Sequence, residues 1–325
     1  MQTQFDGNRQ FGVEIETSRT GPSIRTIARA LNDAGISTRD VGYTHRTMST
    51  WKVVPDASTG PEIVSPPLRG QAGLDEIARV CEVLQSIGCR VDRSTGLHVH
   101  HDFFDGSKKN LKSILFLYAK AQAVTNALLP TRTNSRWGQA VNAEAIEIRE
   151  PSIERHARAM GNRNDLRYYA VNIQQGRYHA VNSQAFAGHG TVEFRQHSGS
   201  LNASKIQAWV VFTQNIVTSG MAKKVSRSAV LSSRRAGGSP AQQLLSELGR
   251  DSNCDVVKKA RQNIVQRIYE NAERGRGGLT LNTLSEFLGA TIKYLTPAQR
   301  RILRQLNSCT ERPVPCSWRC RSGNC

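Results

Sequence analysis

Near its amino end the chain reads Phe11-Gly-Val-Glu-Ile-Glu-Thr17, in which apolar and acidic residues alternate. Successive side chains of a β-strand point to opposite faces of the sheet. The alternation therefore predicts a strand that carries Glu14 and Glu16 on one face and apolar side chains on the other. The apolar face can pack against helices, and the other face brings two carboxylates close together.

Two later stretches alternate in the same way but carry other ionisable groups. One reads Leu97-His-Val-His100 and the other reads Val192-Glu-Phe-Arg-Gln-His197. We expect the two histidines of the first stretch, His98 and His100, to share a face. On the second stretch we expect one face to carry three polar groups, namely Glu193, Arg195 and His197. For each strand taken alone, an ordinary solvated face is the alternative.

The rest of the pattern predicts an α+β fold. Apolar residues at helical spacing predict helices over residues 21–34, 74–87, 110–129 and 202–221. Short apolar stretches predict strands at 51–54 and 62–64, and an antiparallel pair at 178–186 and 191–197 joined by residues 187–190. We therefore expect a mainly antiparallel sheet with helices packed on one face.

Charge is unevenly distributed along the chain. The 325 residues have a formal net charge of +18. Residues 221–325 hold 19 Lys/Arg and 7 Asp/Glu, whereas residues 1–220 hold 25 and 19. A basic region can attract ATP, a nucleic acid or a membrane surface, or can simply be solvated. The sequence shows no signal peptide and no apolar run that could cross a bilayer, so we expect a soluble, cytoplasmic protein.

Composition divides the chain into regions. Residues 1–222 form the predicted sheet domain, in which the polar stretch 131–170 is expected to be a mobile insertion that closes as a lid. Residues 223–239 are predicted to be a linker, and residues 240–307 a basic helical appendage. The tail, residues 308–325, holds Cys309, Cys316, Cys320 and Cys325. Their spacing lacks the Cys-x-x-Cys pair of common zinc modules, so reduced thiols are favoured over a structural zinc site.

The polar faces of the strands favour a divalent-cation site. Carboxylates at neighbouring positions repel each other unless a cation lies between them. Oxygen ligands with an imidazole and no thiolate favour magnesium or manganese, which link protein carboxylates to substrate phosphates. Arg195 would then bind a phosphate or carboxylate through its planar guanidinium. The competing interpretation is a zinc or iron hydrolase site built on His98 and His100.

Four segments occur in the order found in the amidoligase family, which the chain resembles over about residues 10–220. They are Gly12-Val-Glu-Ile-Glu16, Pro61-Glu-Ile-Val-Ser-Pro-Pro-Leu68, Gly96-Leu-His-Val-His100 and Thr191-Val-Glu-Phe-Arg-Gln-His-Ser-Gly-Ser-Leu201. That family belongs to the carboxylate–amine ligase superfamily of glutamine synthetase and glutamate–cysteine ligase. The resemblance implies that residues 1–222 form a glutamine-synthetase-like catalytic domain with a curved sheet.

The resemblance also implies individual roles. Glu16 and Glu62 would bind one Mg²⁺ or Mn²⁺ ion. A second ion, which bridges the phosphates of ATP, would be held by Glu14, His98 and Glu193. His100 would contact ATP. The transferred phosphate would be steadied by Arg195, with Arg177 as a further candidate.

The implied reaction is ATP-dependent amide formation between a small-molecule or peptide carboxylate and an amine, through an acyl phosphate. His197 or Asp56 could act as the base. Two alternatives remain open. A nucleic-acid-binding protein on a catalytically inactive ligase fold would bind an anionic polymer through its basic C-terminal region, and binding would weaken steeply with salt. A metal-dependent hydrolase that uses His98 and His100 would turn over without ATP.

Overall fold

The computed structural model describes residues 5–133, 135–161, 165–222 and 254–274. Within these residues seven strands form one sheet in the order β2-β3-β4-β1-β5-β7-β6. All neighbouring pairs are antiparallel except β2 and β3. The strands are β1 (Phe11–Glu16), β2 (Thr38–Asp40), β3 (Trp51–Pro55), β4 (Pro61–Val64), β5 (Gly96–Asp102), β6 (Val181–Asn182) and β7 (Thr191–Ser198). The predicted α+β class with a mainly antiparallel sheet is confirmed.

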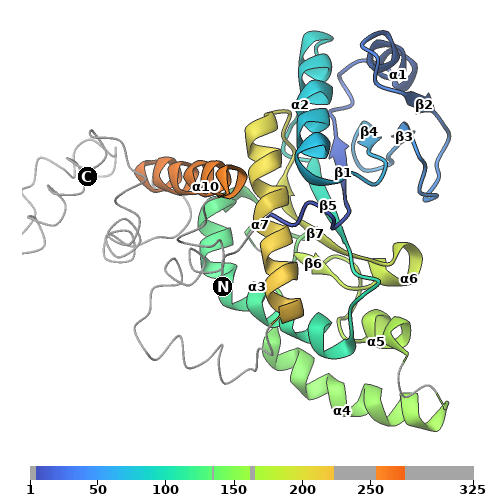
Figure 1. Cartoon of the computed structure of the whole chain (residues 1–325), viewed down its shortest axis with the longest axis vertical. Helices are drawn as coiled ribbons and strands as arrows, with labels where there is room; N and C mark the ends of the chain where they lie inside the picture. Colours follow the sequence, from blue (N-terminus) through green and yellow to red (C-terminus); the bar gives the residue numbers. More distant parts are fainter. Residues whose placement is uncertain (1–4, 134, 162–164, 223–253, 275–325) are drawn as a thin grey trace, which may run out of the picture.

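The longest helices lie on one side of this sheet. Figure 1 shows α2 and α7 lying across the strands, with α3 beside α7 and α10 reaching it from the side. Helix α7 contacts α2, α3, α10 and strand β5. The helices in the described residues are α1 (Ile24–Asp33), α2 (Gly70–Ser86), α3 (Lys108–Leu128), α4 (Ala143–Ala159), α5 (Leu166–Asn172), α6 (Ala185–His189), α7 (Ala203–Ala222) and α10 (Asp255–Glu273), with a 3-10 turn at Pro130–Arg132.

The alternation of β1 is explained by this arrangement. Phe11, Val13 and Ile15 are each at most 1% exposed and belong to the hydrophobic core. Helix α7 is buried along most of its length because it lies among the sheet and three other helices, and its Trp209 is fully buried. Burial of one large apolar side chain contributes about 2–3 kcal/mol. The other face of β1 is left to polar side chains.

Capping residues place the helix ends near the predicted positions. Ser23 Oγ accepts a hydrogen bond from Thr26 N at 3.2 Å at the start of α1. Gly35, with φ of 74°, follows the end of that helix, where a left-handed residue is favoured. Ser107 and Asn110 form a capping box at the start of α3. Helix α2 begins at Gly70, four residues before the predicted start.

The chain between α5 and β7 differs from the prediction. Strand β6 contains only Val181–Asn182, and α6 fills most of the connection, so the predicted strand at 178–186 is wrong in length. Ser183 leaves the sheet because its Oγ donates to Ala170 O of α5 at 2.7 Å. The antiparallel pairing of β6 with β7 is confirmed. Strand β2 is not predicted because its three residues are too short to carry a periodic signal.

The polar stretch 131–170 contains α4 and α5, which pack against α3. Ile153 of α4 and Tyr169 of α5 are buried. Lys112 Nζ of α3 lies 2.8 Å from Glu150 Oε2 of α4, and the Tyr169 hydroxyl donates to the other oxygen of Glu150 at 3.0 Å. The closure of this stretch as a lid stays a prediction.

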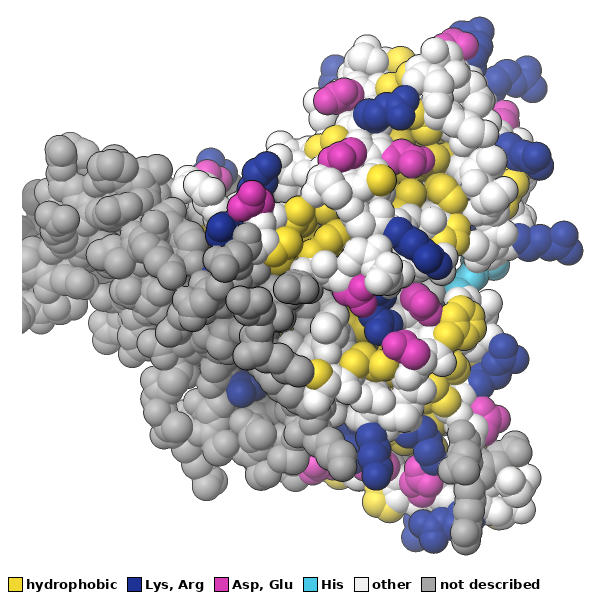
Figure 2. All heavy atoms as spheres, viewed as in Figure 1, with side chains coloured by type: hydrophobic (Ala, Val, Ile, Leu, Met, Phe, Trp, Pro, Cys, Tyr) yellow, Lys and Arg dark blue, Asp and Glu magenta, His cyan; other side chains and the backbone are white. Residues whose placement is uncertain are grey.

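Several expectations fall outside the described residues. They are the linker at 223–239, the appendage at 240–307 apart from α10 and its flanking residues, and the tail at 308–325 with its four cysteines. In the part of the chain that the structure describes, no helix is long and apolar enough to cross a membrane. On the face seen in Figure 2, acidic and basic side chains are interspersed with apolar ones.

Candidate active site

Strand register gathers the predicted polar residues on the sheet face opposite α7. Directly opposed residues of antiparallel strands point to the same face. Three opposed pairs supply the cluster: Glu14 with His98, Glu16 with Glu62, and His100 with Glu193. The next residue along, His101, faces the helices, because its Nε2 lies 2.7 Å from Thr213 Oγ1 of α7. Strands β4, β1, β5 and β7 thus contribute to a single cluster.

The side chains of this cluster lie within a few ångströms of one another. His98 Nδ1 lies 2.9 Å from Glu14 Oε2 and 3.7 Å from Glu193 Oε1, and His98 Nε2 lies 3.5 Å from Glu16 Oε1. His100 Nε2 lies 3.3 Å from Glu14 Oε1 and 3.9 Å from Glu193 Oε1. Gly96 N donates to Glu16 Oε2 at 2.5 Å. The strands therefore bring together the residues that the sequence analysis predicts as metal ligands.

Two overlapping groups in the cluster have ligand atoms close enough to hold a cation. One is Glu14, His100 and Glu193, and the other is Glu14, Glu62 and His98; in each group the ligand atoms lie within 4.8 Å of one another. Glu14 belongs to both. The two groups overlap with the implied sets, and Glu16 lies beside them, because its Oε1 is 3.5 Å from His98 Nε2. Which of these side chains hold each ion stays a prediction.

The donor chemistry of these groups fits a hard divalent cation. Most donors are carboxylate oxygens, which magnesium and manganese favour. His100 Nε2 is buried and makes no well-aligned hydrogen bond among the described residues, although Glu14 Oε1 lies 3.3 Å from it. A buried polar atom without a partner is costly, so a ligand would satisfy it.

The carboxylates of the cluster differ in how well their charge is compensated. Burial alone would raise the pKa of Glu14, but the adjacent His100 and His98 hold it well below 4.5. Burial likewise opposes ionisation of Glu193, yet Arg195 and the histidines lower its pKa. The pKa of Glu62 is raised well above 4.5 by burial and by repulsion from Glu14 and other carboxylates. The charge of Glu62 is therefore less well compensated by its neighbours than the charges of Glu14 and Glu193.

Two side chains fix the orientation of Glu193. Arg195 Nη1 donates to Glu193 Oε1. Asn182 Nδ2, from β6, donates to Glu193 Oε2 at 2.6 Å. The side chain of Arg195 is only 10% exposed. Its buried positive charge is compensated by the nearby carboxylates of Glu193 and Glu14. The contact between Arg195 and Glu193 thus places a candidate metal ligand next to a guanidinium group that can bind an anion.

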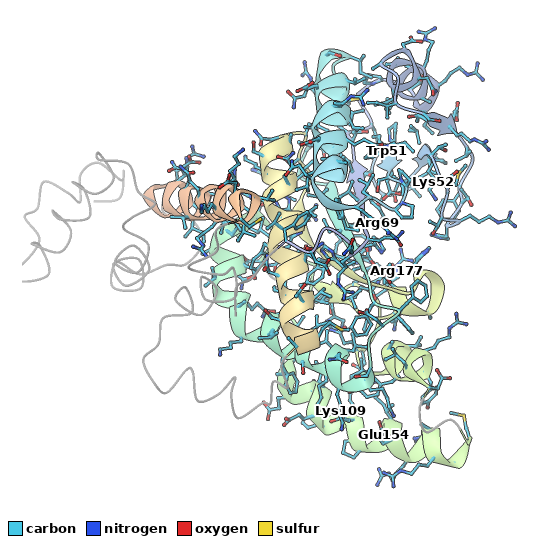
Figure 3. The ribbon with its side chains drawn as sticks, in the orientation of Figure 1. Trp51, Lys52, Arg69, Lys109, Glu154 and Arg177 are labelled. Atoms are coloured by element: carbon cyan, nitrogen blue, oxygen red, sulfur yellow. The ribbon has the colours of Figure 1, made fainter. Side chains whose placement is uncertain are left out.

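Two cavities flank the cluster, and Glu14, His100 and His189 line both. The smaller has a volume of about 350 Å³, and the larger about 630 Å³. The smaller cavity has an apolar wall, formed by Met48, Val64, Pro66, Pro67 and Phe104. The larger cavity has a polar and cationic wall, formed by Arg177, Asn182, Gln184 and Arg195, none of which lines the smaller cavity. Figure 3 shows Lys52 and Arg177 on the side of the molecule that carries β3 and α6.

The expectation that His197 shares the face of Glu193 and Arg195 is wrong. Strand β7 contains a bulge, so His197 pairs with Leu97 and turns toward the helices, where it lies against Trp209. Burial and the nearby Arg267 hold the pKa of His197 well below 6.5. A β-bulge adds one residue to a strand and so reverses the alternation of the side chains that follow it. The sequence carries no signal that predicts this bulge.

Asp56, the other predicted base, is tied into the turn between β3 and β4. Its Oδ1 accepts hydrogen bonds from Ser58 N at 2.6 Å, from Ser58 Oγ at 2.5 Å and from Thr59 N at 3.0 Å. This is the arrangement of an Asx turn, in which the carboxylate stabilises the backbone. Asp56 therefore has a structural task in this turn.

Three residues at the site are not singled out by sequence reasoning. Lys52 is buried on the cluster side of β3 and donates to Thr44 O at 3.1 Å and Arg46 O at 2.8 Å, which fixes the loop lining both cavities. Arg132 is buried and donates to Thr95 O, beside Glu16. His189 meets His100 edge to face at 5.9 Å between ring centroids. The sequence alone could not single out Lys52, because only the register of β3 against β4 shows that it shares a face with Glu62.

Comparison with known proteins agrees with the resemblance. A family model described as "Putative amidoligase enzyme" matches residues 7–217. The match spans more than half of the chain and includes the whole cluster, so the chain belongs to this amidoligase family. Membership indicates a ligase-type enzyme. No curated protein matches the chain.

Proposed function

We propose that the chain is an ATP- and Mg²⁺-dependent ligase that joins a carboxylate to an amine through an acyl phosphate, on a glutamine-synthetase-like domain. The observation that carries this proposal is the convergence of Glu14, Glu62, His98, His100 and Glu193 from four strands, next to Arg195 and between two cavities. The family match supports the ligase class. The carboxylate-rich donor set favours phosphate chemistry over a histidine-dominated hydrolase site.

The carboxylates and histidines of the cluster would hold one or two divalent cations. When bound, Mg²⁺ or Mn²⁺ would neutralise charge on the phosphates of ATP. Glu14 would be shared between the two groups, with Glu193 and His100 on one side and Glu62 and His98 on the other. The hydrogen bonds from Asn182 and Arg195 would keep Glu193 in place during turnover.

The two cavities would separate the substrates. The apolar wall of the smaller cavity suits the base of ATP, and His100, which lines both cavities, would contact its phosphates. The larger cavity, with Arg177 and Arg195 on its wall, suits an anionic carboxylate substrate. The reacting groups would then meet where Glu14 and His100 lie, at the boundary of the cavities.

The reaction has two steps. A carboxylate oxygen attacks the γ-phosphorus of ATP, the bond to the β,γ-bridging oxygen breaks, and ADP leaves. The amine nitrogen then attacks the acyl carbon, a carbon–nitrogen bond forms, and phosphate leaves. Arg195 would bind the transferred phosphoryl group as charge redistributes. A ring nitrogen of His189, which lines both cavities and whose pKa is lowered by burial and by His100, would accept the proton from the amine.

An ADP-release assay tests the proposal. The wild-type protein, ATP and Mg²⁺ are screened against pools of amino acids, peptides and amines. Release that requires Mg²⁺, a carboxylate and an amine together is expected, and Glu193→Ala should abolish it. Glu82→Ala, at an exposed position of α2, is the matched control. Turnover without ATP would instead favour the metal-dependent hydrolase, and salt-sensitive polymer binding that survives Glu193→Ala would favour the nucleic-acid-binding alternative.

A further inference from the structure

Helix α10 lies outside the residues matched by the family, yet it reaches the strand that carries Arg195. It packs against α7 and α3, as Figure 1 shows. Arg267 Nη2 donates a hydrogen bond to His197 Nε2 at 3.1 Å. Asn271 Nδ2 donates to two carbonyl oxygens at the carboxyl end of α3, at 2.9 and 3.1 Å. Polar contacts therefore connect α10 to the sheet through the helix layer.

Only one proton arrangement on His197 satisfies both of its contacts. Its Nδ1 lies 2.6 Å from Ser198 O, which can only accept, so Nδ1 carries the proton. Its Nε2 must then be the acceptor, and the guanidinium of Arg267 can only donate. The ring is 1% exposed, and its centroid lies 5.4 Å from that of Trp209. His197 is thus fully satisfied on the helix side of the sheet.

The position of His197 depends on the bulge in β7. Val99 pairs with Phe194 and Leu97 pairs with His197, so β7 has one more residue than β5 between these two pairs. The extra residue reverses the alternation. Arg195 therefore keeps the face of the cluster, whereas His197 points away from it. If the bulge slid by one residue, the side chains next to it would exchange faces.

Two anchors hold the bulge from the helix side. Gln196 donates from Nε2 to Asn126 Oδ1 at 2.7 Å and accepts from the hydroxyl of Tyr118, and both partners belong to α3. The second anchor is the contact between His197 and Arg267, and it comes from α10. The anchored residues, Gln196 and His197, are the two that follow Arg195 in the sequence. Their contacts therefore restrain the backbone that sets the direction of the Arg195 side chain.

We propose that Arg267 is a positioning residue for Arg195 and that α10 is part of the catalytic unit. Arg267 holds His197 on the helix side, which fixes the bulge and keeps Arg195 directed toward Glu193 and the polar cavity. The part of this inference that concerns nucleotide binding rests on the proposed function. The part that concerns the bulge can be tested without it.

The test compares the full chain with Arg267→Met, which keeps an apolar stem and removes the donors. Lys259→Met is the control, because it removes the same charge from an exposed position of α10. Calorimetry measures the affinity for AMP-PNP, a non-hydrolysable ATP analogue, with Mg²⁺, and hydrogen exchange measures residues 194–198. Arg267→Met should weaken AMP-PNP binding and accelerate this exchange, each about tenfold. Lys259→Met should stay within about twofold, and Arg267→Lys should recover part of the loss.

A double variant separates positioning from general destabilisation. On a His197→Leu background, Arg267→Met should change AMP-PNP affinity by less than about twofold, because the contact is already lost. Fully additive effects would overturn the proposal, as would unchanged affinity and exchange in Arg267→Met. If Arg267→Met does not fold, His197→Leu removes the same contact with the same expected results. If wild type binds no AMP-PNP but exchange rises in Arg267→Met, the ligase proposal fails and the anchoring of the bulge stands.

Discussion

Substitution of Glu62 should have opposite effects on the metal-free and metal-loaded protein. Its ligand oxygen lies within 4.8 Å of that of Glu14. Two unit charges at this distance repel each other by about 3.5 kcal/mol at an effective dielectric constant of about 20. Attraction to Lys52 offsets part of this repulsion. Glu62→Gln should therefore stabilise the metal-free protein by about 1–2 kcal/mol and raise its Tm by about 2–6 °C.

The same substitution removes a metal-ligand candidate. The affinity for Mn²⁺ should fall about tenfold or more, and saturating Mn²⁺ should raise the Tm of wild type more than that of Glu62→Gln. Because folding raises the pKa of Glu62, the residue costs stability progressively as pH rises from about 4.5 through the folded-state pKa, and the cost is constant above that. The advantage of Glu62→Gln should accordingly vanish below pH 4.5, where the residue is protonated in both states.

Differential scanning calorimetry with and without Mn²⁺, together with isothermal titration, measures these effects. Glu82→Gln removes an exposed carboxylate and should change neither the Tm nor the Mn²⁺ affinity. A metal-free Glu62→Gln protein that melts below wild type, with an unchanged response to Mn²⁺, would refute the reasoning, since Glu62 would then be stabilised without a cation.

Further substitutions test other parts of the account. Lys52→Met removes the hydrogen bonds that hold the loop at 42–49, so hydrogen exchange there should rise about tenfold; exchange at the wild-type rate would contradict this. Burial lowers the pKa of His101 from 6.5 to about 3, so its contribution to stability should fall by about 1.4 kcal/mol per pH unit as pH drops from 6.5 toward 3. Urea unfolding of wild type and His101→Gln across this window measures the difference, and parallel curves would argue against a buried neutral ring. A Cβ at Gly60 would lie 2.6 Å from the backbone carbonyl carbon of Ser18. Gly60→Ala should therefore lower the free energy of unfolding, measured with denaturant, by about 2–4 kcal/mol. An unchanged free energy would show that the turn can shift.

Much of the sheet and of its polar face could be predicted from period-two alternation. Glu14, His98 and Glu193 lie on strands whose other face is apolar. Because the apolar face of such a strand packs against the core, the polar side chains must lie on the opposite face. The same logic failed at His197, because a bulge adds one residue and carries no compositional signal. Strand alternation gives the face of each side chain, but only register gives its neighbours.

Contacts that depend on register or on irregular backbone were out of reach. The pairing of His100 with Glu193 could not be read from either strand alone. Lys52 enters the site through hydrogen bonds to loop carbonyl groups, which have no sequence pattern. The docking of α10 on α7 and α3 could not be predicted either, because contacts between distant helices depend on tertiary packing. The polar stretch at 131–170 gave only weak helical signals, since α4 buries few of its side chains and contains Pro151.

Anomalous scattering from Mn²⁺ in crystals grown with AMP-PNP tests the central claim most directly. The account predicts at least one strong peak within bonding distance of Glu14 and Glu193, where the carboxylates of β1 and β7 meet the histidines of β5. Density for the nucleotide phosphates should lie next to that peak, on the side of His100. A map with ordered AMP-PNP elsewhere and no peak among these side chains would contradict the account.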